Sequence, residues 1–108
     1  MPYIRQNPVY ENINPNSRDL VPFLLVVQSP FLDELSTRVT VPLYNQKKAP
    51  GPLIDRLHMI IEIDGIGYVA VFNHLAAVPK KNLGKLRVTI ENMHTEITAA
   101  LDFLFHGY

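Results

Sequence analysis

Apolar and polar residues alternate along much of the first 90 residues, with the two-residue period of a β-strand. The clearest alternation lies in segment 37–43. Its apolar side chains would share one face of a strand: Val39, Val41 and Leu43. Arg38 and Thr40 would then share the opposite face. Similar alternation predicts further strands over 57–63, 66–72 and 85–90.

The segment 21–28 differs because nearly all of its residues are apolar. This composition predicts a strand buried on both faces, although a short buried helix has the same pattern. Asp64-Gly65 separates two of the alternating runs and predicts a tight β-hairpin. A weaker strand is expected over 3–9. Pro8 would place it at an edge of the sheet, and Pro42 predicts an edge or a bulge in segment 37–43.

Turn-forming residues separate these strands. Segment 12–18 is rich in asparagine, whose side chain bonds to nearby backbone, and it predicts a turn. Segment 44–52 contains lysine, proline and glycine and predicts a loop, and 73–79 is expected to be a connector. The strands are thus expected within about residues 3–90.

The period of the apolar residues changes after residue 90. Apolar side chains recur there at helical spacing: Met93, Ile97, Ala100, Leu101 and Leu104. Asn92 is the expected N-cap, and Gly107 stands where helices commonly end. We therefore predict a helix over about 92–105 and a short carboxyl-terminal tag over 106–108.

Composition limits the class of protein. The 108 residues suit a single domain, 1–108, and the formal net charge of zero argues against a dedicated nucleic-acid binder. The chain has no cysteine, and no apolar run is long enough to cross a membrane. The amino terminus lacks the pattern of a signal peptide. We expect a cytoplasmic domain without membrane contact.

The sequence contains no motif typical of an enzyme. The four histidines have no metal-ligand spacing, and no Gly-x-Ser-x-Gly motif is present. We therefore expect no catalytic residue, no metal and no cofactor. One basic cluster, formed by Lys80, Lys81, Lys85 and Arg87, is either a solvated surface or a contact for a partner.

The last six residues include three aromatic side chains, Phe103, Phe105 and Tyr108. Phe103 and Phe105 lie about 100° to either side of Leu104 on a helix, so one helix cannot bury both against a small barrel. Two interpretations remain open. The aromatic rings either fold back as an extra layer of core, or they form an exposed patch that meets a partner.

Several segments, taken in order, resemble CcdB-type toxins. The resemblance extends over about three quarters of the chain, and these segments carry it: Val26–Asp33, Arg38–Leu43, Leu75–Pro79, Gly84 and Ile97–Tyr108. Leu75 stands where the family has a methionine. No single motif is specific, and it is the ordered set that carries the resemblance.

The resemblance implies a mostly β fold with a C-terminal α-helix, an SH3-like small barrel that forms a homodimer. It also implies the toxin of a type II toxin–antitoxin module. Such a toxin binds the GyrA subunit of DNA gyrase and traps the gyrase–DNA cleavage complex, without being an enzyme. A CcdA-like antitoxin neutralises it, and only the toxin–antitoxin complex binds operator DNA as a repressor.

Residues that match the family's gyrase-binding surface come from three places. The tag contributes His106, Gly107 and Tyr108. The helix before it contributes Ala99, Asp102 and Phe105. The loop after the buried strand contributes Ser29, Phe31 and Leu32.

The tag departs from the family's usual Trp-Gly-Ile, because His106 stands in the position of the tryptophan that anchors the family to gyrase. An imidazole buries less ring area than an indole, which would cost about 2 kcal/mol of binding free energy. A co-adapted gyrase, a different target and a weakened toxin are the three outcomes. Two other functions stay open: a MazF- or Kid-like endoribonuclease, and a plain dimerisation module.

Overall fold

The computed structural model describes residues 7–49, 51 and 54–107. Its strands within these residues are β1 (Asn7–Asn12), β2 (Phe23–Val26), β3 (Thr37–Asn45), β4 (His58–Ile63), β5 (Ile66–Val71), β6 (Ala76–Pro79) and β7 (Leu83–Ile90). The α-helix is α1 (His94–His106). Three short 3-10 helices lie between the strands: η1 (Pro30–Leu32), η2 (Phe72–His74) and η3 (Lys80–Asn82).

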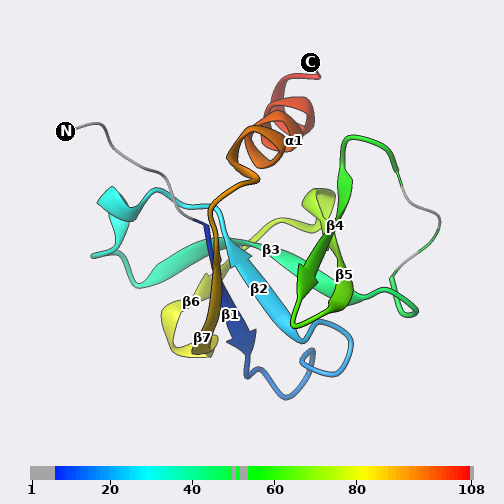
Figure 1. Ribbon diagram of the computed structural model, residues 1–108. Helices are drawn as coiled ribbons and strands as arrows, with labels where there is room; N and C mark the ends of the chain where they lie inside the picture. The colour runs from blue at the N-terminus through cyan, green and yellow to red at the C-terminus, as the bar shows by residue number, and fades with distance from the viewer. Residues whose placement is uncertain (1–6, 50, 52–53, 108) are drawn as a thin grey trace.

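The strands form one antiparallel sheet with the order β4-β5-β3-β2-β1-β7, and β6 pairs with β3 beside this path. The sheet curls into a half-barrel, and α1 stands above it (Figure 1). The predicted fold class, mostly β with a C-terminal α-helix, is confirmed.

The strand β2 is buried on both faces, as the apolar run predicted. Its four residues are all buried, and alternate side chains enter two separate clusters. Phe23 and Leu25 pack in the larger cluster, which also contains Ile97 of α1. Leu24 packs in the smaller cluster with Tyr44. The sheet therefore has apolar contacts on both sides of its middle strands.

The prediction that the first strand lies at an edge is wrong. β1 lies between β2 and β7, and the first part of the predicted segment, 3–6, lies outside the described residues. Pro8 pairs with Thr89 of β7 on one side only, because the residues of β1 that pair with β2 begin at Val9. Asn7 supplies a side-chain bond in this region, since its Nδ2 donates to the Val26 carbonyl at 3.2 Å.

The strand that contains Pro42, β3, has partners on both sides and is not an edge strand, although Pro42 itself is paired on one side only. On one side it pairs with Leu24 of β2. On the other side β3 pairs with β6 up to Thr40 and with β5 from Leu43. Pro42 falls between these two partners, where its missing N–H interrupts neither ladder.

The hairpin at Asp64-Gly65 is confirmed, since Ile63 pairs with Ile66 across a two-residue turn. Both turn residues have positive φ, 53° for Asp64 and 80° for Gly65, as a type I′ turn requires. The turn meets the opposite end of the sheet, because Arg87 of β7 pairs with Asp64 and with Glu11 of β1.

Two segments differ from their predicted forms. The expected connector 73–79 contains strand β6, and β3 continues to Asn45, two residues into the expected loop. Both differences arise because a neighbouring strand is present: Ala77 pairs with Val39, and Tyr44 pairs with Val69. Tertiary pairing here overrides the weak local signal. The predicted turn at 12–18 is present after Asn12, which itself belongs to β1.

The helix α1 begins later and ends later than expected. Met93, rather than Asn92, is its N-cap, and it makes no side-chain capping bond. Met93 instead packs against the larger cluster, so packing sets the start of the helix. His106 belongs to the last turn of α1 rather than to the tag. Ile97 and Ala100 are buried, as the helical spacing predicted.

Gly84 of β7 lies against β1, and we predict that Gly84→Ala destabilises the fold. A Cβ at this position would stand 2.7 Å from Ile13 Cγ2 and 3.2 Å from the Glu11 carbonyl oxygen. The free energy of unfolding should fall by about 1–2 kcal/mol in a urea titration. The matched control is Lys85→Ala at the next, exposed position, which should change it by less than about 0.5 kcal/mol. Equal effects of the two substitutions would contradict the close packing at Gly84.

Candidate functional site

The loop after β2 and the helix after β7 leave the sheet at the same end. Both β2 and β7 are antiparallel to β1, so they run in the same direction and their last residues lie at one end of the sheet. Figure 1 shows α1 rising from this end, with its last turn farthest from the strands. The sheet therefore brings the two candidate segments, 29–32 and 99–107, to a common end of the molecule.

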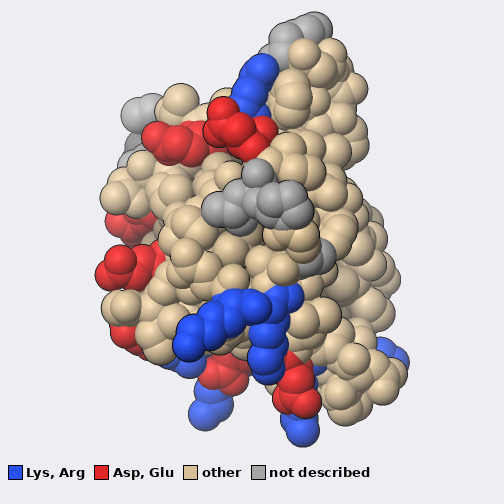
Figure 2. All heavy atoms as spheres, turned by 90° about the vertical axis from the view of Figure 1, so that its right-hand side faces the viewer, with Lys and Arg blue, Asp and Glu red and all other residues tan. Residues whose placement is uncertain are grey.

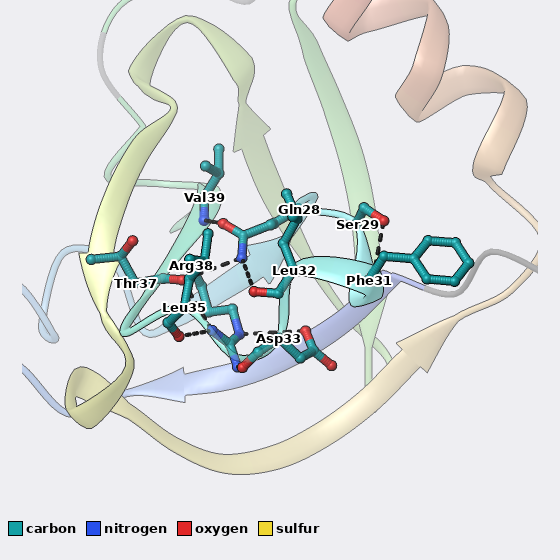
Figure 3. A network of polar contacts seen from close by, with 9 residues as sticks. All are labelled: Gln28, Ser29, Phe31, Leu32, Asp33, Leu35, Thr37, Arg38 and Val39. Atoms are coloured by element: carbon teal, nitrogen blue, oxygen red, sulfur yellow. Dashed lines mark hydrogen bonds and ion pairs between the residues drawn. The ribbon is translucent and has the colours of Figure 1, made fainter.

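The loop segment is apolar on its outside. Phe31 is 79% exposed and Leu32 is 49% exposed, which is unusual for large apolar side chains. Ser29 caps η1, because its hydroxyl oxygen accepts from the Phe31 N–H at 3.2 Å. In Figure 3 the Phe31 ring points away from the other side chains drawn. The three loop residues predicted from the resemblance thus share one short, capped turn.

Two residues that position this loop were missed by the sequence analysis. Arg38 was placed on the face opposite Val39, but its role was not recognised; it is 7% exposed and contacts the loop backbone. Gln28 contacts the same loop from its other end. The sequence signal that could have identified them is a long polar side chain at each end of a loop that contains a proline and large apolar residues.

The helical residues of the candidate surface are also accessible. Ala99, Asp102 and Phe105 are exposed, with Phe105 at 63%. Their spacing of three residues places them on neighbouring turns of one side of α1. The exposed Phe105 is therefore not part of an extra core layer.

Phe103 behaves differently from Phe105. It is half-buried, and the Arg56 guanidinium carbon lies 4.1 Å from its ring centre. This cation–π contact joins the last turns of α1 to the loop before β4. Beside it, a pocket of about 270 Å³ opens between that loop and the first turns of α1, and Ala99 is among its lining residues.

The helix ends as the glycine predicted. Gly107 has a left-handed φ of 79°, and its N–H donates to the Phe103 carbonyl at 3.0 Å. His106 and Gly107 are both exposed. Tyr108, the last residue of the predicted tag, lies outside the described residues. The structure thus places eight of the nine predicted site residues at the surface or partly at the surface.

The basic cluster is weaker as a binding surface than its sequence indicates. Arg87 pairs with Asp64 and Glu11, and the hydrogen bond to Asp64 raises the pKa of Arg87 above its ordinary value. This arginine therefore carries its own counter-ions. Figure 2, seen from the side of the β4–β5 hairpin, shows basic and acidic side chains lying next to one another near the top and near the bottom of this face. No single sign of charge dominates this face.

A catalytic or metal centre would require several titratable side chains close together. In the ranges 7–49, 51 and 54–107, no three metal-binding side chains of histidine, aspartate or glutamate gather as ligands. Tyr44 and His74 form a pair, with 2.8 Å between the hydroxyl oxygen and Nδ1. Burial raises the pKa of the Tyr44 phenol, which keeps the hydroxyl protonated and able to donate to the imidazole.

The chain matches a known protein family. The family model described as CcdB protein matches residues 6–107, nearly the whole chain. No curated protein matches the chain. Within the described residues, no helix is long and apolar enough to span a membrane.

We predict that Tyr44 makes the fold sensitive to alkaline pH. The raised pKa means that the folded protein holds the phenolic proton more tightly than the unfolded chain. This contribution to stability is complete below about pH 10 and is lost as pH rises through the folded pKa. In urea titrations from pH 8 to 11, the unmodified protein should lose stability more steeply above pH 10 than Tyr44→Phe. Parallel curves for the two proteins would contradict this assignment.

Proposed function

The chain belongs to the CcdB family of toxins, since the family model covers residues 6–107, and from this premise we propose that it poisons DNA gyrase. The proposed target is the GyrA subunit. The toxin binds this subunit and traps the complex in which gyrase holds cleaved DNA. The protein itself supplies binding energy rather than catalytic groups.

The observation that carries this proposal is the pair of exposed aromatic side chains at one end of the sheet. Phe31 stands on the loop after β2, and Phe105 stands on the last turns of α1. Exposed aromatic residues contribute a large share of binding energy in protein interfaces. Segments that are far apart in the sequence thus supply exposed apolar side chains at one end of the sheet, and they are the segments that resemble the gyrase-binding residues of the family.

The full surface in this proposal contains the loop residues Ser29, Phe31 and Leu32 and the helical residues Ala99, Asp102 and Phe105. The tag residues His106, Gly107 and Tyr108 complete it. The left-handed Gly107 lets the tag turn away from the helix axis. Asp102, the one acidic side chain among these residues, provides a charged contact beside the apolar ones.

His106 replaces the family's tryptophan, and we propose that the gyrase surface of the host has changed with it. Imidazole offers hydrogen-bond donors and acceptors where indole offers ring area. A matching pocket would then be smaller and more polar than the one that accepts tryptophan. Phe31 and Phe105 keep large apolar contacts available beside it.

The other partners follow from the same family assignment. We propose a homodimer, which presents two copies of the surface to a two-fold symmetric gyrase. A CcdA-like antitoxin neutralises the toxin in the cytoplasm, and operator DNA is bound only through the toxin–antitoxin complex. The formal net charge of zero supports this indirect contact with DNA, because a protein that binds DNA by itself is normally basic.

We predict that removing the last two residues of the tag abolishes poisoning without unfolding the protein. The variant lacks Gly107 and Tyr108, which follow the last helical residue. Purified host gyrase should accumulate cleaved DNA with the intact protein and not with the truncated one, while both melt within a few degrees of each other. Trapping by both proteins would contradict the role of the tag. Cleavage of RNA by the intact protein would instead favour the MazF-like endoribonuclease.

We further predict that Phe31→Ala weakens binding to gyrase at least tenfold, the effect of losing an interface hot spot. The ring is 79% exposed, so the substitution should leave the free energy of unfolding within about 0.5 kcal/mol of the original. Titration calorimetry with purified GyrA measures the affinity. Ile66→Ala, at an apolar residue of β5 that is 53% exposed, is the control and should bind normally. Equal affinities of the two variants would place Phe31 outside the interface.

A further inference from the structure

The side chain of Arg38 lies inside the loop that carries the candidate contact residues. Its Nη1 donates to the carbonyl oxygens of Leu35 at 2.7 Å and of Thr37 at 3.0 Å. Its Nη2 donates to the Asp33 carbonyl at 2.7 Å. Figure 3 shows the guanidinium surrounded by the turns of this loop. One side chain therefore collects three backbone acceptors from a segment of five residues.

Gln28 reaches the same loop from the end of β2. Its Nε2 donates to the carbonyl oxygens of Leu32 at 3.2 Å and of Thr37 at 3.3 Å. Its Oε1 accepts from the Val39 N–H at 3.1 Å. Gln28 and Arg38 thus stand at the two ends of the loop, and both bond to the Thr37 carbonyl.

Arg38 and Gln28 form these hydrogen bonds with backbone atoms. The bonds therefore fix the backbone conformation of the loop rather than the position of a single side chain. Backbone acceptors that lie outside a strand or helix need partners when they are turned inward. Arg38 suits this role because its planar guanidinium carries donors in fixed directions, whereas a lysine ammonium is a single compact centre. The charge is met by the Asp33 carboxylate, whose Oδ1 lies 3.7 Å from Nε.

Large apolar side chains are exposed on the outside of the same loop. Phe31, Leu32 and Leu35 are exposed by 79%, 49% and 50%, and we call these three residues the loop crest. Three large apolar side chains on one short loop are exposed to water, and a partner that covers them removes this apolar area from water. A loop that already has a fixed conformation loses less conformational entropy when the partner binds. The hydrogen bonds inside the loop therefore hold in place the apolar side chains that it exposes.

We propose that Arg38 and Gln28 are positioning residues that hold the loop crest in the conformation that binds the target. This inference rests on the proposed function and adds to it: Leu35 joins the binding surface, and residues that touch no partner set its affinity. The crest binds as a preformed surface instead of ordering itself on contact.

The test uses Arg38→Lys, which keeps the charge but loses the planar set of donors. Arg18→Lys, at an exposed arginine, is the matched control. Each substitution is made in the full-length chain and in a Phe31→Ala/Leu32→Ala background, and the affinity for purified GyrA is measured by calorimetry at a temperature where every variant is folded. We expect Arg38→Lys to weaken binding at least tenfold in the original chain and less than twofold in the double-alanine background. Arg18→Lys should leave affinity unchanged in both.

A role in stability alone predicts a different result, because loss of folded protein lowers apparent binding equally in both backgrounds. Equal losses, or no loss in either, would overturn the proposal. Gln28→Ala provides a second variant in case Arg38→Lys does not fold, and the same background dependence is expected of it. Asp33→Asn should keep most of the affinity, since the Asp33 side chain is 62% exposed and its backbone carbonyl remains bonded.

Amide hydrogen exchange gives a measurement that needs no partner. The N–H groups of Leu32, Asp33 and Leu35 are bonded within the loop, to Ser29, Pro30 and Leu32 respectively. We expect Arg38→Lys to speed their exchange at least tenfold relative to amides in β2. Unchanged exchange would overturn the inference that Arg38 fixes the loop, whatever the partner. Failure of the unmodified protein to bind gyrase, with faster exchange in Arg38→Lys, would instead overturn the proposed function, and the role of Arg38 in fixing the loop would stand.

Discussion

Burial of β2 on both faces is the constraint on which the rest of the structure depends. Leu25 enters the cluster that also holds Ile97 of α1, while Leu24 enters the cluster that holds Tyr44 and Val69. A strand in this position cannot shift by one residue without exchanging the two sets of side chains. Its register fixes where the following loop begins and which cluster the helix covers. The candidate surface is built from these two neighbours of β2.

The contact between the β4–β5 turn and β7 completes this arrangement. Arg87 joins Asp64 of the turn to Glu11 of β1, and these groups come from opposite ends of the strand order. The sheet is curled enough for the two ends to meet, and the larger cluster fills the space that the curl encloses. Arg87 also lies 5.2 Å from the ring centre of Phe23, so the ionic contact is next to the core. The half-barrel thus combines apolar packing inside with ion pairs at its rim.

Local patterns in the sequence predicted the elements with strong periodic signals. The hairpin at Asp64-Gly65 and the helical face of Ile97 and Ala100 are present, and the segment 21–28 contains a strand buried on both faces over Phe23–Val26. Errors arose where a residue depends on a distant partner. Pro42 sits between two neighbours of β3 that no local pattern identifies, and β6 exists because β3 offers it a partner. For the same reason, the resemblance identified the exposed Phe31, whereas no local pattern indicated that the buried Arg38 bonds to the backbone of the loop.

The parallel course of β2 and β7 has a practical consequence for attaching labels to this protein. β1 is antiparallel to both, so it begins at the same end of the sheet where α1 leaves it. A fluorophore or affinity handle joined near either of these points would crowd the apolar surface. The turn 15–20, between β1 and β2, lies at the opposite end and is mostly exposed. A handle inserted there stays a full strand length away, so immobilisation through this turn leaves the loop crest and the last turn of α1 facing solution.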